Sequence, residues 1–260
     1  MVELKHISKV FQTNDGDFQA LKDVNLQIPD GEIYGIIGMS GAGKSTLVRC
    51  LNLLETPDDG TLSVGDSGVI TLRGGKAYDA QGRKLTERKL GAMRRGIGMI
   101  FQHFNLLDRS TVFENIAYPL RYTGMKKADI AIRVKELLEQ CGLEEELAKR
   151  YPHEVSGGQC QRAAIARALA VEPKVLICDE ATSSLDVTIQ KQIMELLEEL
   201  KDKHGLSFIF ICHNLALVQS FCDKVLVLYD GKVVESGRPD AIINEPKEAY
   251  TKKLVDAVFE

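Results

Sequence analysis

The stretch Gly38–Thr46, GMSGAGKST, constrains this chain more than any other. It comes directly after the apolar run EIYGIIG, which is typical of a buried strand. The pattern GxxxxGK[ST] is met in full at Gly38, Gly43, Lys44 and Ser45. Glycines let consecutive backbone N–H groups curl around phosphate oxygens, and a following helix adds the positive end of its dipole. The alternative is a glycine-rich turn without a ligand, but the strand before and the helix after favour phosphate binding.

We expect the whole motif to hold the phosphate chain of a nucleotide. In this arrangement Lys44 reaches the β and γ phosphates, and the Ser45 hydroxyl is a ligand of Mg²⁺. The expected nucleotide-binding residues are Gly38, Met39, Ser40, Gly41, Ala42, Gly43, Lys44, Ser45 and Thr46.

An acidic motif follows another apolar run, since KVLIC precedes Asp179 and Glu180 in KVLICDEATSSLD. In open α/β folds, ligands bind at the carboxyl ends of the strands. Asp179 therefore suits ligation of Mg²⁺, directly or through water, and Glu180 suits polarising a water for in-line attack on the γ phosphate. The alternative is an ordinary acidic strand end, which the presence of the phosphate-binding motif argues against.

A second anion-binding stretch is VSGGQCQR, Val155–Arg162. Ser156 can cap a helix, and Gly157 and Gly158 leave the N–H groups at its start uncovered. One ATP has one γ phosphate, which Lys44 already holds. The second helix start therefore suggests service to a nucleotide bound by another copy of the chain, and the alternative is a plain capped helix.

With these motifs in this order, the chain resembles the nucleotide-binding subunit of an ABC transporter, from about Val2 to Ile243. The resemblance implies an ATPase that uses ATP and Mg²⁺ and forms an ATP-dependent homodimer. In that family the SGGQ signature of one subunit closes over the ATP on the partner subunit. Here the signature residues are Ser156, Gly157, Gly158 and Gln159.

The same resemblance implies four further roles. Gln102, in MIFQHF, contacts the Mg²⁺ and water region and senses the membrane partner. His213 contacts the γ phosphate and orients the catalytic carboxylate, whereas a lone histidine after a strand is usually structural. Phe11 stacks on adenine, its alternative being a strand residue packed in the small β layer. Asp186 lies in the SSLD loop that couples the two sites of the dimer.

Strands that alternate with helices indicate an α/β fold with a largely parallel sheet and antiparallel strands added at one side. The resemblance makes this a P-loop NTPase of the ABC type, with a helical subdomain inserted in the core. We expect one ABC ATPase domain over residues 1–260. Its parts are a core at about 1–101 and 171–243, a helical subdomain at about 102–170, and a tail at 244–260.

Local patterns predict the main elements. Val2–Ile28 alternates apolar and polar residues as antiparallel strands do, and a strand is expected at Ile33–Ile37. A helix should run from about Lys44 to Leu54, and others should start near Ser156 and Val187. The sequence KVLVLYDGKVVESG predicts a hairpin with Asp-Gly at its turn.

Composition limits the partners and the compartment. A net charge of −4 gives no bulk electrostatic reason to bind nucleic acid or an anionic membrane. No apolar run approaches the roughly 20 residues that span a bilayer, and the start of the chain lacks the apolar core of a signal peptide. The 6 cysteines are scattered singly, as reduced thiols in a core are. We therefore expect a cytoplasmic protein.

The resemblance places the chain at the cytoplasmic face of the membrane as a peripheral subunit. It implies two transmembrane permease subunits and, indirectly, an extracellular or periplasmic substrate-binding protein. A groove near Gln102, with Phe104, Leu106 and Leu107, is expected to receive a short helix of the permease, although these residues are equally compatible with a core.

A closer resemblance lies in IYGIIGMSGAGKSTLVRCLNLLE and GMIFQHFNLLDRSTVFENI, which look like the ATPases of methionine importers and, more broadly, of amino-acid uptake systems. The alternative is an ABC ATPase of another transporter class or of a division-type membrane complex. A P-loop kinase or GTPase does not explain SGGQ or His213. Val155, Cys160 and Asn214 depart from the commonest family pattern, and the long stretch Ser63–Leu90 has no assigned role.

Overall fold

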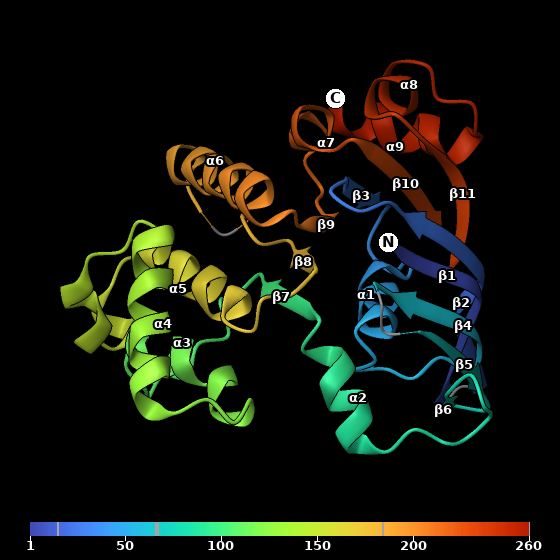
Figure 1. Cartoon of the computed structure of the whole chain (residues 1–260). Helices are drawn as coiled ribbons and strands as arrows, with labels where there is room; N and C mark the ends of the chain where they lie inside the picture. The colour runs from blue at the N-terminus through green and yellow to red at the C-terminus, as the bar shows by residue number, and fades with distance from the viewer. Residues whose placement is uncertain (15, 66–67, 184, 260) are drawn as a thin grey trace. The chain divides into compact units, whose positions relative to one another are not determined.

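The computed structural model describes residues 1–14, 16–65, 68–183 and 185–259. The chain forms two compact units (Figure 1). Unit 1 comprises Met1–Arg94 and Ser207–Glu260, and unit 2 comprises Arg95–Leu206.

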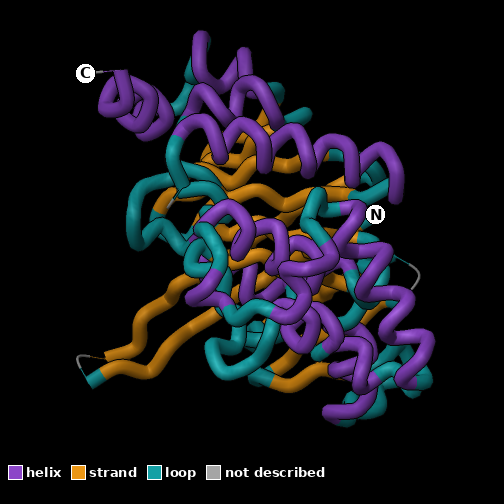
Figure 2. The backbone as a smooth tube through the Cα atoms, turned by 90° about the vertical axis from the view of Figure 1, so that its left-hand side faces the viewer, coloured by secondary structure: helices purple, strands orange, loops and turns teal. Residues whose placement is uncertain are grey.

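Unit 1 contains an antiparallel sheet with the strand order β2-β1-β4-β5-β6. The two longest strands pair from Val2↔Ile28 to Thr13↔Gly16 and form the long ribbon in Figure 2, which confirms the predicted antiparallel start of the chain. Side chains alternate between buried and exposed over the last part of β2, from Val24 to Ile28, as in a sheet with one covered face. The strands are β1 (Val2–Thr13), β2 (Gly16–Ile28), β4 (Asp59–Val64), β5 (Val69–Arg73) and β6 (Lys76–Tyr78).

The second group of strands in unit 1 is mostly parallel. In the order β11-β10-β3-β9, the last three run parallel and β11 returns antiparallel to β10 through Asp230 and Gly231. All residues of β3 and β9 are buried, as expected for parallel strands covered on both faces. The strands are β3 (Ile33–Ile37), β9 (Ser207–Ile211), β10 (Lys224–Tyr229) and β11 (Lys232–Gly237).

The helices of unit 1 are α1 (Lys44–Leu51), α2 (Glu87–Arg94), α7 (Leu215–Phe221), α8 (Pro239–Asn244) and α9 (Ala249–Phe259). Figure 1 shows α7, α8 and α9 near β10 and β11. The predicted helix after the phosphate motif forms but ends at Leu51, since Leu53 takes a left-handed φ of 56°. Helices α2, α8 and α9 were not predicted.

Unit 2 combines a pair of strands with helices. Strands β7 (Ile97–Phe101) and β8 (Val175–Asp179) are parallel, in register from Ile97↔Val175 to Phe101↔Asp179. Helix α5 packs against α3, α4, α6 and β7, and Figure 1 shows α3, α4 and α5 gathered together. The helices are α3 (Val112–Ala117), α4 (Lys127–Gln140), α5 (Gly157–Leu169) and α6 (Val187–His204), with 3₁₀ turns at Pro119–Tyr122, Glu145–Lys149 and Pro152–Glu154.

Parallel strands, an antiparallel β part and a helical part are all present, so the predicted fold class is confirmed. The subdomain boundary at about 102–170 stays a prediction. Within the described ranges, no helix combines the length and the apolar character needed to cross a bilayer.

Candidate nucleotide-binding site

The phosphate motif connects the end of β3 to the start of α1 in unit 1. Gly43 is the N-cap residue of α1, with a left-handed φ of 106°, and it makes no side-chain cap hydrogen bond. The first turn of α1 also contains no acidic residue. A helix start without a side-chain cap or a negative charge is suited to an anion, because its N–H groups and dipole attract one.

The structure explains why glycine stands at three positions of the motif. A Cβ at Gly38 would collide with the backbone oxygen of Leu228, and a Cβ at Gly43 would collide with that of Ala20. Gly41 has a φ of 80°, and a Cβ there would meet nothing within 4 Å. The loop is therefore packed tightly at its two ends and uncovered at Gly41, which leaves backbone for a phosphate to approach.

Lys44 is held over this loop. Its Nζ donates hydrogen bonds to the backbone oxygens of Gly38, at 2.7 Å, and Met39, at 2.9 Å. The residue is only 6% exposed, although the neighbouring Ser45 is exposed. A buried ammonium beside a helix start that no side chain caps fits the charge of a phosphate chain.

Phe11 is half-buried in β1, and the Lys9 ammonium lies 5.2 Å from the centre of its ring. Phe18 of β2 is its partner in the ladder and is 52% exposed. The sequence analysis did not single out Phe18. An exposed aromatic directly across a strand pair from Phe11 was the signal that could have found it.

His213 also lies in unit 1, exposed and directly after β9. The next residue, Asn214, is the N-cap of α7, and its Oδ1 accepts hydrogen bonds from the N–H groups of Ala216, at 3.0 Å, and Leu217, at 3.3 Å. Asparagine is among the best N-cap residues. The departure from the family pattern at Asn214 therefore has a local structural reason.

In unit 2, the register of the two strands brings three predicted residues to one sheet edge. Phe101 pairs with Asp179, so Gln102 and Glu180 leave neighbouring strands side by side. All three predicted residues are half-buried. Glu180 has a left-handed φ of 51°, an uncommon conformation for a glutamate that is often found at functional sites.

The segment that follows Glu180 is fixed by side chains that the sequence analysis did not identify. Gln161 of α5, which is fully buried, donates a hydrogen bond from Nε2 to the backbone oxygen of Ala181. Gln190 of α6 donates to the Thr182 hydroxyl at 2.9 Å. These contacts join residues 20 and 8 positions apart in the chain, and spacing alone does not reveal them.

Asp186 ends this segment as the N-cap of α6, and its carboxylate accepts a hydrogen bond from the N–H of Ile189 at 2.9 Å. The residue is exposed. Of the SSLD loop predicted to couple two sites, Ser184 lies outside the described residues.

The signature stretch begins α5 with a reciprocal cap. The Ser156 hydroxyl accepts a hydrogen bond from the Gln159 N–H at 3.3 Å, and the Gln159 amide oxygen accepts one from the Ser156 N–H at 2.9 Å. Ser156 and Gly157 are exposed, whereas a Cβ at Gly158 would lie 2.9 Å from Ile189. The Ser156 hydroxyl keeps its hydrogen for a ligand oxygen.

The loop after Gln102 is pinned to α5. Phe104 and Asn105 both have left-handed φ angles, of 57° and 48°. Arg167 donates to the backbone oxygen of Asn105 at 2.6 Å and to that of Phe104 at 2.9 Å. Leu106 is half-buried and Leu107 is 45% exposed. Arg167 is a supporting residue that the sequence analysis missed.

The predicted Mg²⁺ ligands are an exposed hydroxyl in unit 1, Ser45, and an amide and a carboxylate in unit 2, Gln102 and Asp179. These are the oxygen ligands that Mg²⁺ prefers, alongside waters and substrate phosphates. Among the residues that the structure describes, no group of three or more His, Cys, Asp or Glu side chains could hold a metal ion.

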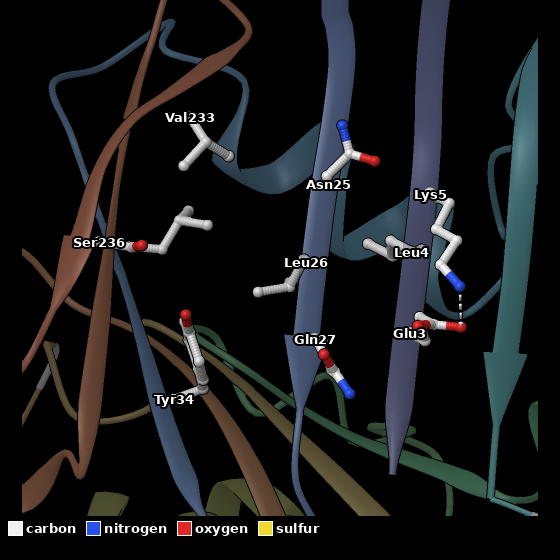
Figure 3. A pocket seen from close by; sticks show the side chains of 10 residues that line it. Glu3, Leu4, Lys5, Asn25, Leu26, Gln27, Tyr34, Val233 and Ser236 are labelled. Carbon is white, nitrogen blue, oxygen red and sulfur yellow. Dashed lines mark ion pairs between the residues drawn. The ribbon is translucent and has the colours of Figure 1, made fainter.

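A pocket of about 360 Å³ lies elsewhere in unit 1, between β1, β2, β3, β10 and β11. Figure 3 shows Tyr34, Val233 and Ser236 on one side of it and the strand with Asn25, Leu26 and Gln27 on the other, with the Glu3–Lys5 ion pair at 2.9 Å nearby. None of the predicted nucleotide residues lines it. It is not the predicted phosphate site.

Comparisons with known proteins show which family this chain resembles. The sequence profile described as "ABC transporter" matches residues 21–183. The methionine import ATP-binding protein MetN 3 of Pectobacterium atrosepticum is 47% identical over 259 residues, covering 100% of this chain and 71% of that protein. The methionine import ATP-binding protein MetN 1 of Bacillus cereus is 45% identical with the same coverage.

Solved structures are similar as well. A dimeric, post-hydrolysis state of the ATP-binding cassette MJ0796, bound to ADP and Pi, superposes with a TM-score of 0.78 at 34% identity, over 92% of this chain and 99% of that one. CbiO1 from Clostridium perfringens, part of the ABC transporter complex cbiONQ, gives a TM-score of 0.77 at 29% identity, over 94% of this chain and 90% of that one. With the phosphate loop and the carboxylates described above, these matches lead to one conclusion: the chain belongs to the ABC transporter family and is a nucleotide-binding ATPase.

Proposed function

We propose that this ATPase powers a membrane importer for methionine. The observation that carries the proposal is 47% identity, over the whole chain, to a protein named for methionine import. The substrate is expected to be selected by a binding protein outside the cytoplasm and by the permease. The ATPase contributes the energy of ATP hydrolysis.

The phosphate loop holds the substrate ATP in this proposal. Its backbone N–H groups and Lys44 bind the phosphate chain, with the uncovered backbone at Gly41 as the closest approach. Phe11 stacks on the adenine ring. Support comes from the helix start that no side chain caps and from the buried ammonium.

Hydrolysis depends on Glu180, which polarises the attacking water, and on His213, which contacts the γ phosphate and orients that carboxylate. Bound Mg²⁺ would neutralise charge on the phosphates. Asp179, Gln102 and Ser45 are the residues proposed to hold it. The half-buried sheet edge that carries Asp179, Glu180 and Gln102 supports this assignment.

A second copy of the chain completes each site. Ser156, Gly157, Gly158 and Gln159 of one copy bind the γ phosphate of the ATP held by the other, and Asp186 couples the two sites. The exposure of Ser156 and Gly157 leaves them accessible to another molecule. ATP therefore closes the dimer, and loss of the γ phosphate opens it again.

The proposed membrane partners are two permease subunits at the cytoplasmic face of the membrane. Leu107, in the loop that follows Gln102, is 45% exposed, as a docking surface requires. Arg167 holds the same loop rigid through its two hydrogen bonds. Docking there lets the permease act on Gln102.

Uptake of labelled L-methionine tests the proposed cargo. Cells that lack this chain should take up methionine more slowly, the wild-type chain should restore uptake, and the Glu180→Gln variant should not. The control is the uptake of a chemically distant amino acid such as lysine, which should not change. Restored lysine uptake with unchanged methionine uptake would contradict the proposed cargo and leave the ATPase assignment intact.

A further inference from the structure

Helix α9 is firmly docked on unit 1. Thr251 is fully buried, and Leu254 and Val255 are each only 8% exposed. At the start of the helix, the Glu235 carboxylate of β11 accepts hydrogen bonds from the N–H groups of Lys247, at 3.0 Å, and Glu248, at 3.2 Å. The apolar contacts and the carboxylate together fix the position of α9 relative to β11.

From this position, α9 reaches the phosphate loop through Tyr250. The Tyr250 hydroxyl accepts a hydrogen bond from the backbone N–H of Met39 at 2.9 Å, joining residues 211 positions apart. Its ring stacks on Tyr229 of β10, with ring centres 4.0 Å apart and an interplanar angle of 29°. The stack limits the positions that the hydroxyl can take.

The hairpin of β10 and β11 supports the same loop at two more points. The Gly231 N–H donates to the backbone oxygen of Ala42 at 3.0 Å. Gly38 lies so close to the backbone oxygen of Leu228 that no side chain fits. The loop is thus anchored at Gly38, Met39 and Ala42, and of these anchors only the one at Met39 comes from α9.

We propose that Tyr250 is a positioning residue for the nucleotide. Its hydroxyl holds the first part of the phosphate loop in the binding conformation, so that nucleotide affinity depends on the docking of α9. Without this hydrogen bond, Met39 and the residues after it have more conformations to lose when phosphate binds. The inference rests on the proposed function, in which ATP binds this loop.

The Tyr250→Phe variant tests this inference, with Tyr229→Phe as a matched control. Both variants remove one phenol hydroxyl from the same ring stack, but the described structure gives no hydrogen bond for the Tyr229 hydroxyl. We expect Tyr250→Phe to weaken MgATP binding about three- to tenfold, the worth of one hydrogen bond. Tyr229→Phe should bind as the wild type does. Isothermal titration calorimetry on the whole chain measures each Kd.

Two further measurements distinguish a positioning role of Tyr250 from a general loss of folded structure. The KM for ATP should rise in Tyr250→Phe while kcat stays within twofold, and circular dichroism should show that the variant is fully folded at the assay temperature. Equal affinity in Tyr250→Phe and the wild type, equal losses in both variants, or a loss explained by partial unfolding at the assay temperature would each overturn the inference. If the wild type itself does not bind MgATP, the proposed nucleotide site is wrong and this inference falls with it.

Discussion

The fully buried side chain of Gln161 donates a hydrogen bond to the backbone oxygen of Ala181. Gln161 lies on α5, the helix that begins with the signature residues, and Ala181 directly follows Glu180. The backbone at Glu180 is left-handed, a conformation that persists only when its surroundings hold it. The helix proposed to serve the partner's ATP thus also holds the carboxylate proposed to act on this copy's own ATP.

Replacing Gln161 with Met should lower both stability and activity. The substitution leaves the buried carbonyl of Ala181 without a donor, which costs about 1–3 kcal/mol of unfolding free energy. Urea denaturation measures this loss, and the ATPase rate should fall as well because Glu180 is less well held. The control is Gln192→Met on the exposed surface of α6, expected to stay within about 0.5 kcal/mol. If Gln161→Met loses no more unfolding free energy than the control, the hydrogen bond from Gln161 to Ala181 does not hold the segment after Glu180.

Replacing Arg167 with Lys should loosen the loop after Gln102. A lysine retains the charge but lacks the planar fork that donates to the oxygens of both Phe104 and Asn105. We expect faster amide hydrogen exchange in residues 102–107, together with a loss of about 1.5–3 kcal/mol, as for hydrogen bonds from a charged group. Mass spectrometry of exchanged peptides locates the effect. Unchanged exchange in this loop would count against the proposed support of the permease-docking surface.

Two glycines of the phosphate loop should respond differently to alanine. At Gly43 the added Cβ collides with the backbone oxygen of Ala20, so Gly43→Ala should fold poorly. At Gly41 there is open space, and Gly41→Ala should cost about 1–2 kcal/mol for its left-handed backbone but remain folded. Its Cβ fills the face that we assign to phosphate, so nucleotide binding should be lost. If Gly41→Ala is folded and binds MgATP with normal affinity, the phosphate does not bind against the backbone of Gly41.

The cysteines should be unreactive in the folded protein. All 6 are free and buried, and burial raises the pKa of the Cys50 and Cys141 thiols to about 12. Since the thiolate is the reactive form, these thiols are almost entirely protonated at pH 8 and should react very slowly. A disulfide reagent should therefore modify no thiol in native buffer and all of them in denaturant. If the reagent rapidly modifies one cysteine in native buffer, the structure around that cysteine opens to solvent.

The same pKa shifts predict how stability changes in alkali. The folded pKa of these thiols lies above the unfolded value of about 9, so the unfolded chain loses protons first as the pH rises. Their contribution to stability is fully present below pH 9 and is lost between pH 9 and about 12. Urea midpoints measured across this window should fall more in the wild type than in Cys50→Ala. If the urea midpoints of the wild type and of Cys50→Ala fall equally with pH, Cys50 does not contribute to the loss of stability in alkali.

Much of the fold could be predicted because the sequence patterns are local and strong. The strand Ile33–Ile37 was predicted with its observed bounds, since a turn precedes it and glycines follow it. By contrast, α9 was not identified. The Glu235 carboxylate that helps to fix its start comes from another part of the chain, and nothing in the sequence near α9 indicates this partner.

The candidate site likewise contains some residues that the sequence predicts and others that it does not. Motif spacing predicts roles for Lys44, Glu180 and Ser156, because phosphate chemistry requires those residue types in a fixed local order. It did not identify Arg167 or Tyr250. Their hydrogen bonds join positions 63 and 211 residues apart, and nothing in the sequence near either residue indicates such a partner.

The central claim is that two copies of the chain share each ATP. Light scattering of the Glu180→Gln variant in Mg²⁺-free ATP tests it most directly, because the variant lacks the proposed water-polarising group and should accumulate the closed state. We predict a dimer with ATP, a monomer with ADP, and no dimer when Ser156→Arg is added. A variant that binds ATP and stays monomeric at every concentration would contradict the shared site.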